Sequence, residues 1–486
     1  MANANERTIL FLIADTGAGH RSAANAIRNA INLISEKEQA EWLARQQNKT
    51  EEAAIVSSAP PTYRIEIVDV FEEYSRFPLR EAVKLYGPAI RYNPKIYGRV
   101  FHTSNDARGV LAVQTVANPL IHNGLIRLFT SVKPDIIVSI HPMLNHVTVN
   151  ALRDLGLRVP FITVVTDLVS LHYSWFAPGA DAYIVPTENA KQLYLQRGWD
   201  PERVHVLGMP IDPKFTRPTD SKLELQRKIG LEPGVPVVLL VGGGDGAGGL
   251  QDAVRAISRA RLPVQLLVIT GRNKRLYAHL QRTKSNLHVP TKIFGFVHNM
   301  PEMMRASDVI VTKAGPGTIS EALACHLPII LSGYVPGQEE GNVDYVLQND
   351  VGVLAYDAIE LIDALRRLVK PGSVVLRRQV ENAIRLSRPR ASFDIADCIL
   401  SFMPQVSKSA AWQTLQGRKR RFIRVGSSLR SSEVRLRALR RRLPRMTYIT
   451  FLKSPVVRRI PGLHRQNFSS RFTRLSHRNN NPRSDI

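Results

Sequence analysis

The segment Asp15–His20 reads DTGAGH and joins an apolar run to a helical pattern. Glycines at a strand-to-helix turn let a ligand approach the backbone, and the free N–H groups of the helix N-terminus favour phosphate. An imidazole titrates near neutral pH, so His20 can take a proton from a substrate hydroxyl. The alternative is that His20 binds phosphate at the start of the helix. The pattern therefore indicates either a general base or an anion ligand.

A second chemistry-bearing stretch is Thr312–Asn342, which contains KAGPGT and PGQEEGN. KAGPGT predicts a strand exit followed by a helix, and N–H groups near Thr318 and Ser320 can take a diphosphate. Glu321 is expected in the first helical turn, where it could accept two ribose hydroxyls or act only as a capping charge. The loop PGQEEGN presents three polar side chains that suit a hydroxyl-rich ligand or an ordinary surface turn: Gln338, Glu339 and Asn342.

The elements that must position these residues follow an α/β pattern, in which apolar β-branched runs alternate with helical segments. The first predicted strand is TILFLIA, at Thr8–Ala14. The later ones include Tyr63–Phe71, Asp135–Ile140, Phe161–Asp167, Asp181–Thr187, Arg203–Pro210, Val264–Thr270, Thr291–Phe296, Asp308–Thr312 and Pro328–Leu331. The strand–glycine-loop–helix pattern occurs twice, and its second occurrence opens with PVVLLVGGGDGAGGL at Pro236–Leu250. We therefore predict two facing Rossmann-like domains with a cleft at the carboxyl ends of their strands. The expected divisions are 1–212 (N-terminal domain), 213–234 (linker), 235–385 (C-terminal domain), 386–404 (closing helix) and 405–486 (basic tail).

Charge is concentrated at the end of this 486-residue chain. Of the formal net charge of +25, residues 405–486 supply +19, from 21 Lys and Arg against Glu433 and Asp485. Such a tail is attracted to phosphate polyanions, which leaves nucleic acid and anionic lipid as candidates. Two cysteines cannot form a disulfide framework. With no basic signal-peptide start and no run of about 18 apolar residues, we expect a soluble or surface-bound protein.

The motifs resemble those of a known family. DTGAGHRSAANAI, TDLVSLHYSWFAPG, GGGDGAGG, GFVHNMPEMM, TKAGPGTISEAL and PGQEEGN occur here in the order found in monogalactosyldiacylglycerol synthases, over about Thr8–Asp357. The resemblance implies a GT-B glycosyltransferase that moves galactose from UDP-galactose to diacylglycerol with inversion. Its N-terminal domain would hold the acceptor and its C-terminal domain the sugar nucleotide. The chain is more distantly similar to diacylglycerol glucosyltransferases and to the N-acetylglucosaminyltransferases of lipid-linked muramyl peptide.

The resemblance also implies roles for individual residues. In the donor site, Gly295 and Phe296 would lie by the uracil, and Glu321 would bind the ribose. Gln338 and Glu339 would bind the hexose, with Asn342 nearby. The residues that would bind the diphosphate are Gly243, Gly244, Lys313, Gly315, Pro316, Gly317 and Thr318. Gly17, Gly19 and His172 would contact the acceptor. His20 is the first candidate for the base, and Asp167 is the second, either as base or as the group that orients His20. The chain departs from the family at Ala18, where a glycine is usual, and at Leu171, where plant members carry cysteine.

Cofactors and partners follow from the same residues. Histidines and carboxylates are not spaced as a zinc site, and GGGDGAGG is not a paired-aspartate magnesium motif, so we expect no metal and no cofactor beyond the UDP-hexose substrate. Helix N-termini and Lys313 can neutralise the leaving diphosphate instead. The expected partners are a UDP-sugar, diacylglycerol and an anionic lipid surface, and not nucleic acid, since the tail contains no nucleic-acid-binding module. Galactose and glucose stay open as the donor hexose, and the motifs carry no signal for oligomeric state.

Overall fold

A computed structural model describes residues 5–15, 18–47, 59–84, 94–217, 220–242, 249–404 and Trp412. Within these residues the strands form two six-stranded sheets, and every paired strand is parallel to its neighbour. The first sheet has the order β2-β1-β3-β4-β5-β6. Its strands are β1 (Glu6–Ile13), β2 (Thr62–Asp69), β3 (Ile136–Ser139), β4 (Phe161–Val164), β5 (Ala182–Val185) and β6 (Val204–Val206).

The second sheet has the order β12-β11-β10-β7-β8-β9. Its strands are β7 (Val237–Val241), β8 (Gln265–Ile269), β9 (Thr291–Phe294), β10 (Val309–Thr312), β11 (Ile329–Leu331) and β12 (Gly352–Leu354). Counted from β7, this is the 3-2-1-4-5-6 order of dinucleotide-binding folds. The prediction of two Rossmann-like sheets is confirmed, with β12 as a strand that was not predicted. The order reverses between β1 and β3 in one sheet and between β7 and β10 in the other, and ligands bind outside the strand ends at such points.

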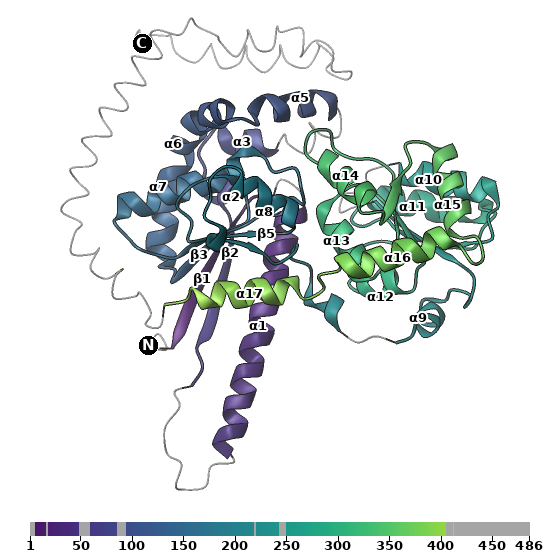
Figure 1. Ribbon diagram of the computed structural model, residues 1–486, viewed down its shortest axis with the longest axis horizontal. Helices are drawn as coiled ribbons and strands as arrows, with labels where there is room; N and C mark the ends of the chain where they lie inside the picture. The colour runs from purple at the N-terminus through teal and green to yellow at the C-terminus, as the bar shows by residue number, and fades with distance from the viewer. Residues whose placement is uncertain are drawn as a thin grey trace, which may run out of the picture. The chain divides into compact units, whose positions relative to one another are not determined.

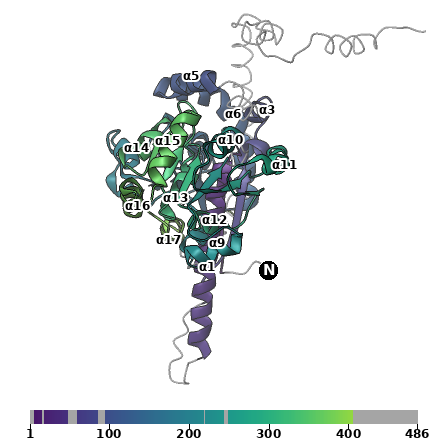
Figure 2. The same cartoon turned by 90° about the vertical axis from the view of Figure 1, so that its right-hand side faces the viewer.

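The first sheet is covered by helices from both ends of the described chain. Ile9 and Phe11 of β1 pack in one apolar cluster with Ile27 of α1 (Ala18–Gln47) and with Ile395 and Ile399 of α17 (Ala391–Ser401). Figure 1 shows α17 crossing beside α1, and Figure 2 shows the second half of α1 projecting beyond the sheet, where most of its residues are exposed. The other helices of this half are α2 (Val70–Tyr74), α3 (Leu79–Lys84), α5 (Pro94–Ser104), α6 (Ala107–Val132), α7 (Asn145–Leu155) and α8 (Glu188–Leu195).

Several of these helices are long, but in the part of the chain that the structure describes no helix is both long and apolar enough to cross a bilayer.

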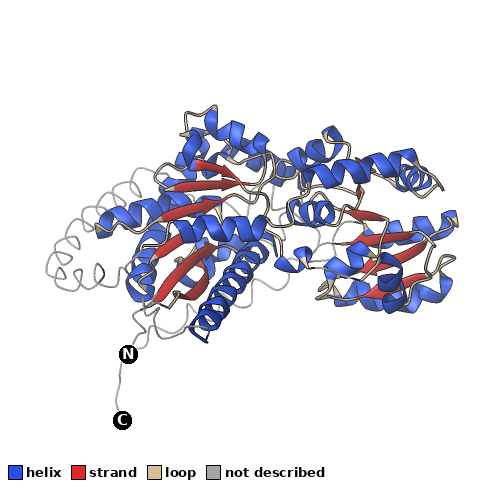
Figure 3. Cartoon of the chain, turned by 60° about the horizontal axis from the view of Figure 1, so that its bottom comes forward, coloured by secondary structure: helices blue, strands red, loops and turns tan. Residues whose placement is uncertain are grey.

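The second sheet lies between two helical layers (Figure 3). One face packs on α10 (Leu250–Ala260), α11 (Lys274–Thr283) and α15 (Ala358–Leu368). The other packs on α12 (Met300–Arg305), α13 (Pro316–Ala324), α14 (Glu340–Gln348) and α16 (Val374–Leu386). Leu168, Met209, Ile211 and Phe215, which follow strands of the first sheet, belong to this second cluster. Apolar packing therefore joins the two sheets into one body.

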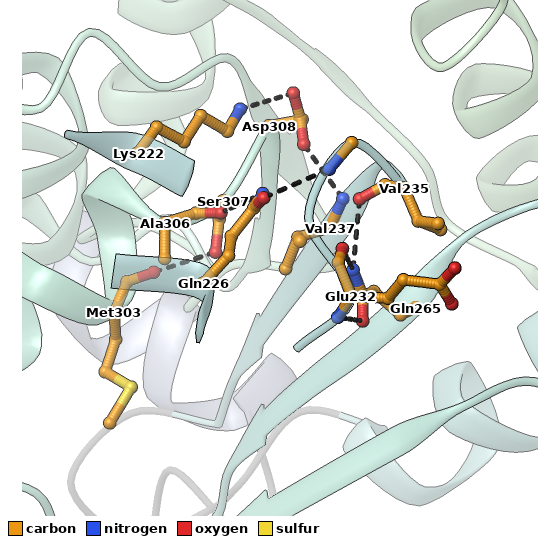
Figure 4. Close-up of polar contacts among 11 residues, drawn as sticks. Lys222, Gln226, Glu232, Val235, Val237, Gln265, Met303, Ala306, Ser307 and Asp308 are labelled. Atoms are coloured by element: carbon orange, nitrogen blue, oxygen red, sulfur yellow. Dashed lines mark hydrogen bonds and ion pairs between the residues drawn. The ribbon is translucent and has the colours of Figure 1, made fainter. Parts of the chain in front are cut away.

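The segment predicted as a linker contains the helix α9 (Lys222–Ile229) and is fastened to the second sheet (Figure 4). Asp308 accepts from Lys222 Nζ at 2.5 Å and from the N–H of Val237 at 2.8 Å. The buried Gln226 donates to the Ala306 carbonyl at 3.0 Å. These bonds fix the chain where it enters β7.

Nearly all of the segment predicted as a basic tail lies outside the described residues, but Trp412 does not. Its side chain is 2% exposed, and its Nε1 donates to the Pro134 carbonyl at 3.2 Å, just before β3. The folded body therefore includes this tryptophan, eight residues beyond the end of the predicted closing helix.

Candidate active site

Two histidines meet at the reversal point of the first sheet. His20 is the third residue of α1, which follows β1, and His141 comes two residues after the end of β3. Because β1 and β3 are neighbours, their exit loops converge, and the two rings lie edge to face with centroids 4.8 Å apart. The ring of Phe71 packs against His141 at 5.5 Å. Of these three residues, the sequence analysis had singled out only His20.

The His20 ring is part-exposed, and the nitrogen it buries is Nδ1, which has no hydrogen-bond partner among the described residues. Burial lowers the pKa of His20 to about 4, although the charge of Asp15 and the Ala14 carbonyl offset part of that effect. The imidazole is therefore uncharged at neutral pH. An uncharged ring can accept a proton, and it lacks the positive charge that would make it a strong phosphate ligand.

The loop that carries His20 is held by carboxylates. Asp69, at the end of β2, accepts from the N–H of Asp15 at 2.9 Å, and Asp15 forms a two-point ion pair with Arg21. A Cβ placed on Gly19 would meet no protein atom within 4 Å, so packing does not require glycine there. Open space over the backbone fits the predicted approach of the acceptor to Gly19, whereas Gly17 lies outside the described residues.

Asp167 lies three residues after β4 and is anchored by Trp175, whose Nε1 donates to Asp167 Oδ2 at 2.6 Å. Burial raises the pKa of Asp167 to about 6, although the Trp175 hydrogen bond lowers it; the charge of Glu339 adds to the increase. Among the described residues, no hydrogen bond joins Asp167 to His20. Its role as base or orienting group stays a prediction.

His172, predicted to contact the acceptor, is fixed through both ring nitrogens. Nδ1 lies 2.7 Å from the Ser174 hydroxyl and Nε2 lies 3.3 Å from the Ser104 hydroxyl at the end of α5. Its ring also packs against Phe101 of α5 at 5.0 Å. Burial lowers the pKa of His172 to about 4, so it is a neutral group that ties the loop after β4 to α5.

The reversal point of the second sheet carries the predicted diphosphate residues. The helix α13 begins at Pro316, and its N-cap residue Gly315 offers no side-chain cap, so the first N–H groups are free for a ligand. A Cβ on Gly317 would meet nothing within 4 Å, which again leaves the backbone open. Thr318 is the third residue of this helix. Gly243 and Gly244, after β7, lie outside the described residues.

An ion pair joins two of the predicted donor ligands. Lys313 Nζ lies 2.5 Å from Glu339 Oε1, and the other oxygen of this buried carboxylate accepts from the N–H of Val335 at 2.8 Å. An ammonium has three donors, so Lys313 can hold Glu339 and still donate to a diphosphate. Asn342 lies in the first turn of α14 and not in the expected loop; it is buried and donates to the Ala314 carbonyl at 2.9 Å, which links the start of this helix to the exit of β10. Gln338 is part-buried in the loop just before α14.

Glu321 does not lie in the first turn of its helix, so that expectation was wrong. It is the sixth residue of α13, because the helix begins at Pro316, and the first turn contains no acidic residue. Burial, with a smaller contribution from the charge of Asp212, raises the pKa of Glu321 to about 7. A part-buried carboxyl that does not cap the helix remains a candidate ribose ligand.

Phe296, predicted to lie by the uracil, is an exposed aromatic ring just beyond the end of β9. Its side chain is 56% exposed, and the Arg272 guanidinium sits over the ring at 5.4 Å. A Cβ on the preceding Gly295 would have only the Gly271 carbonyl near it, at 3.9 Å. The ring is accessible for stacking on a planar base.

No group of three or more His, Cys, Asp or Glu side chains within the described ranges is placed to hold a metal ion. The cationic groups at the second reversal point are instead Lys313 and the N-terminus of α13.

Two protein-family models match most of the residues that the structure describes. Residues 20–211 match the model described as monogalactosyldiacylglycerol (MGDG) synthase, and residues 237–379 match that of the glycosyltransferase family 28 C-terminal domain. The chain is 36% identical to a rice protein named "Probable monogalactosyldiacylglycerol synthase 2, chloroplastic", over 82% of this chain and 81% of that one. It is 35% identical to monogalactosyldiacylglycerol synthase 3 of Arabidopsis thaliana, over 80% of each chain.

Among solved structures, the chain is similar to MurG of Acinetobacter baumannii, with 14% identity, a TM-score of 0.49, and coverage of 81% of this chain and 99% of that one. It is also similar to the UDP-GlcNAc 2-epimerase of Neisseria meningitidis bound to UDP-GlcNAc, with 13% identity and a TM-score of 0.48. That alignment covers 82% of this chain and the whole of the epimerase.

Proposed function

Because the chain belongs to the monogalactosyldiacylglycerol synthase family, we propose that it transfers galactose from UDP-galactose to the free hydroxyl of 1,2-diacylglycerol. The observation that carries this proposal is identity of about 35% to proteins of that name over 80% or more of the chain. The matched family models, 20–211 and 237–379, contain every residue assigned above to donor or acceptor except Gly17 and Gly19. Transfer of an acetamido sugar to a muramyl peptide and nucleic-acid binding are not favoured by these relatives.

The donor binds at the reversal point of the second sheet. The diphosphate lies on the N–H groups of Gly317 and Thr318, with the Lys313 ammonium beside it. Glu321 accepts the ribose hydroxyls, and Phe296 stacks near the uracil. The hexose lies against the PGQEEGN loop, where the ion pair of Glu339 with Lys313 couples sugar binding to phosphate binding.

The reaction is a single displacement with inversion. The neutral His20 takes the proton of the diacylglycerol hydroxyl through its unburied nitrogen while the hydroxyl oxygen attacks the anomeric carbon. The bond from that carbon to the diphosphate breaks, and the electron pair leaves on UDP. Lys313 and the α13 N-terminus stabilise the charge that develops there. Because these groups neutralise the charge on the leaving UDP, we propose that the reaction needs no metal ion.

The acceptor is a membrane lipid, so the N-terminal half must reach a bilayer. Phe77, Leu111 and Val116 are 80%, 64% and 70% exposed, around α3 and the start of α6. The exposed Arg76 precedes Phe77 directly, and the exposed Arg108 lies three residues before Leu111. Apolar side chains with neighbouring cations suit the interface of an anionic leaflet. We place the protein peripherally on the cytoplasmic face of a membrane, with this surface toward the lipid.

The test is turnover by the purified full chain on diacylglycerol in mixed micelles, with UDP-galactose and UDP-glucose in separate reactions. The expected product is β-linked monogalactosyldiacylglycerol, formed equally well after treatment with EDTA. Faster transfer of glucose would refute the assigned hexose, and loss of activity in EDTA would refute the metal-free mechanism. Absence of any glycolipid product, with transfer instead to a lipid-linked muramyl peptide, would refute the proposed function.

A further inference from the structure

His141 is a buried polar residue that the proposed reaction does not use. Its side chain is 7% exposed, and its Nδ1 has no hydrogen-bond partner among the described residues. Among the described residues its ring packs edge to face against His20 and Phe71, and neither of these contacts requires a nitrogen at that position. An unpaired buried nitrogen destabilises a fold, so a phenyl ring in this position would be expected to serve the core better.

The neighbouring His20 ring also buries a nitrogen without a hydrogen-bond partner, and in this case the nitrogen must carry a proton. For His20 to accept a proton at its unburied nitrogen, Nε2, the neutral ring must carry its own proton on Nδ1. That Nδ1 is buried and also has no partner among the residues described. The Ala14 carbonyl raises the pKa of the His20 ring, but no hydrogen bond of normal geometry reaches this nitrogen from the described residues, so the tautomer needs a better acceptor. The neighbouring ring of His141, 4.8 Å away between centroids, carries an unpaired buried nitrogen of its own.

We propose that His141 is a positioning residue for His20: its Nδ1 accepts the Nδ1 proton of His20, after a small ring rotation or through one water molecule. The contact keeps Nε2 of His20 free for the acceptor hydroxyl. This proposal rests on the assignment of His20 as the base. It gives His141 the part that a carboxylate plays in other histidine-based sites, where the partner sets the tautomer.

The electrostatics of the pair agree with this arrangement. Burial lowers the pKa of His141 well below its ordinary value, and the neighbouring His20 and His172 lower it further. The ring therefore stays neutral, as an acceptor must. A neutral partner also avoids repelling His20 when that ring becomes an imidazolium during the reaction, whereas a charged one would oppose proton transfer.

The test compares three variants of the full chain. His141→Phe keeps a flat ring but removes the acceptor, so kcat should fall by about 10–100-fold, part of the 10²–10⁴ that a general base contributes. UDP affinity should be unchanged and Tm unchanged or higher. His141→Asn places an oxygen where Nδ1 was and should restore most of kcat, whereas His141→Gln places it farther out and should not. His146→Phe, on α7, is the matched control and should keep wild-type kcat.

The tautomer of His20 gives a readout that needs no turnover. In protein labelled with ¹⁵N-histidine, the ring-nitrogen shifts of His20 should report a proton on Nδ1 in the wild type and in His141→Asn. The proton should move toward Nε2 in the Phe and Gln variants. A Phe variant with wild-type kcat, or an Asn variant no better than Gln, would overturn the proposal, and the Asn–Gln comparison decides alone if the Phe variant does not fold. Lack of galactosyl transfer by the wild type would instead refute the proposed function and leave the tautomer test standing.

Discussion

Replacing Glu321 by glutamine should strengthen the fold and weaken nucleotide binding at the same time. Burial raises the pKa of this carboxyl from its ordinary value of 4.5 to about 7. At 1.36 kcal/mol per pH unit, the difference corresponds to roughly 3 kcal/mol. The folded state holds the proton more tightly than the unfolded state, so this contribution to stability is complete below pH 4.5 and is lost as the pH rises through 7.

Glu321→Gln cannot ionise and escapes this loss. Its free energy of unfolding in urea should match the wild type near pH 4 and exceed it by roughly 3 kcal/mol at pH 8. If the ionised carboxylate accepts the ribose hydroxyls, the variant loses charge-assisted hydrogen bonds, and UDP should bind about 10–100-fold more weakly in calorimetry. Wild-type affinity for UDP-galactose should also rise by up to about tenfold between pH 6 and 8, as the carboxyl ionises.

The matched control is Glu381→Gln on α16, whose side chain is exposed. It should change the free energy of unfolding by no more than about 0.5 kcal/mol and leave UDP binding unaltered. A Glu321→Gln variant that is less stable than the wild type at pH 8 would mean that the carboxylate has a stabilising partner in the fold. UDP affinity within twofold of the wild type would remove Glu321 from the ribose site.

The pH dependence of kcat at saturating UDP-galactose should distinguish the two candidate bases, because activity should fall below about pH 4 if His20 takes the proton and below about pH 6 if Asp167 does. His20→Ala should lower kcat by about 10²–10⁴-fold with UDP affinity unchanged in calorimetry; the opposite pattern would make His20 a phosphate ligand. Gly317→Ala should weaken UDP binding at an unchanged Tm, since its Cβ meets no protein atom, whereas Gly352→Ala should lower Tm sharply by overlapping a carbonyl oxygen of β11. Trp412→Ala should reduce the free energy of unfolding in urea by about 3 kcal/mol, and an unaltered value would show that its burial is not stabilising.

Much of the architecture could be predicted because its signals are local. A parallel strand covered on both faces is an apolar run, and the glycine loops mark where such runs pass into helices. The missed strand β12 is only three residues long and begins with glycine, so its apolar run is short. The error at Glu321 was also avoidable, since a proline is favoured as the first residue of a helix and KAGPGT contains one.

Residues that meet across the fold were beyond sequence reasoning. The sequence alone determined that a histidine and a glycine turn follow the first strand, because both lie within a few residues of it. That His141 lies against His20 depends on β3 pairing with β1, and that Trp412 is buried near β3 depends on the chain returning to the first sheet. Strand order and docking are decided by which apolar faces pack together over the whole chain. More than a hundred residues separate the two histidines along the chain. Only the tertiary structure therefore shows that they are neighbours and that each buries an Nδ1 without a hydrogen-bond partner among the described residues.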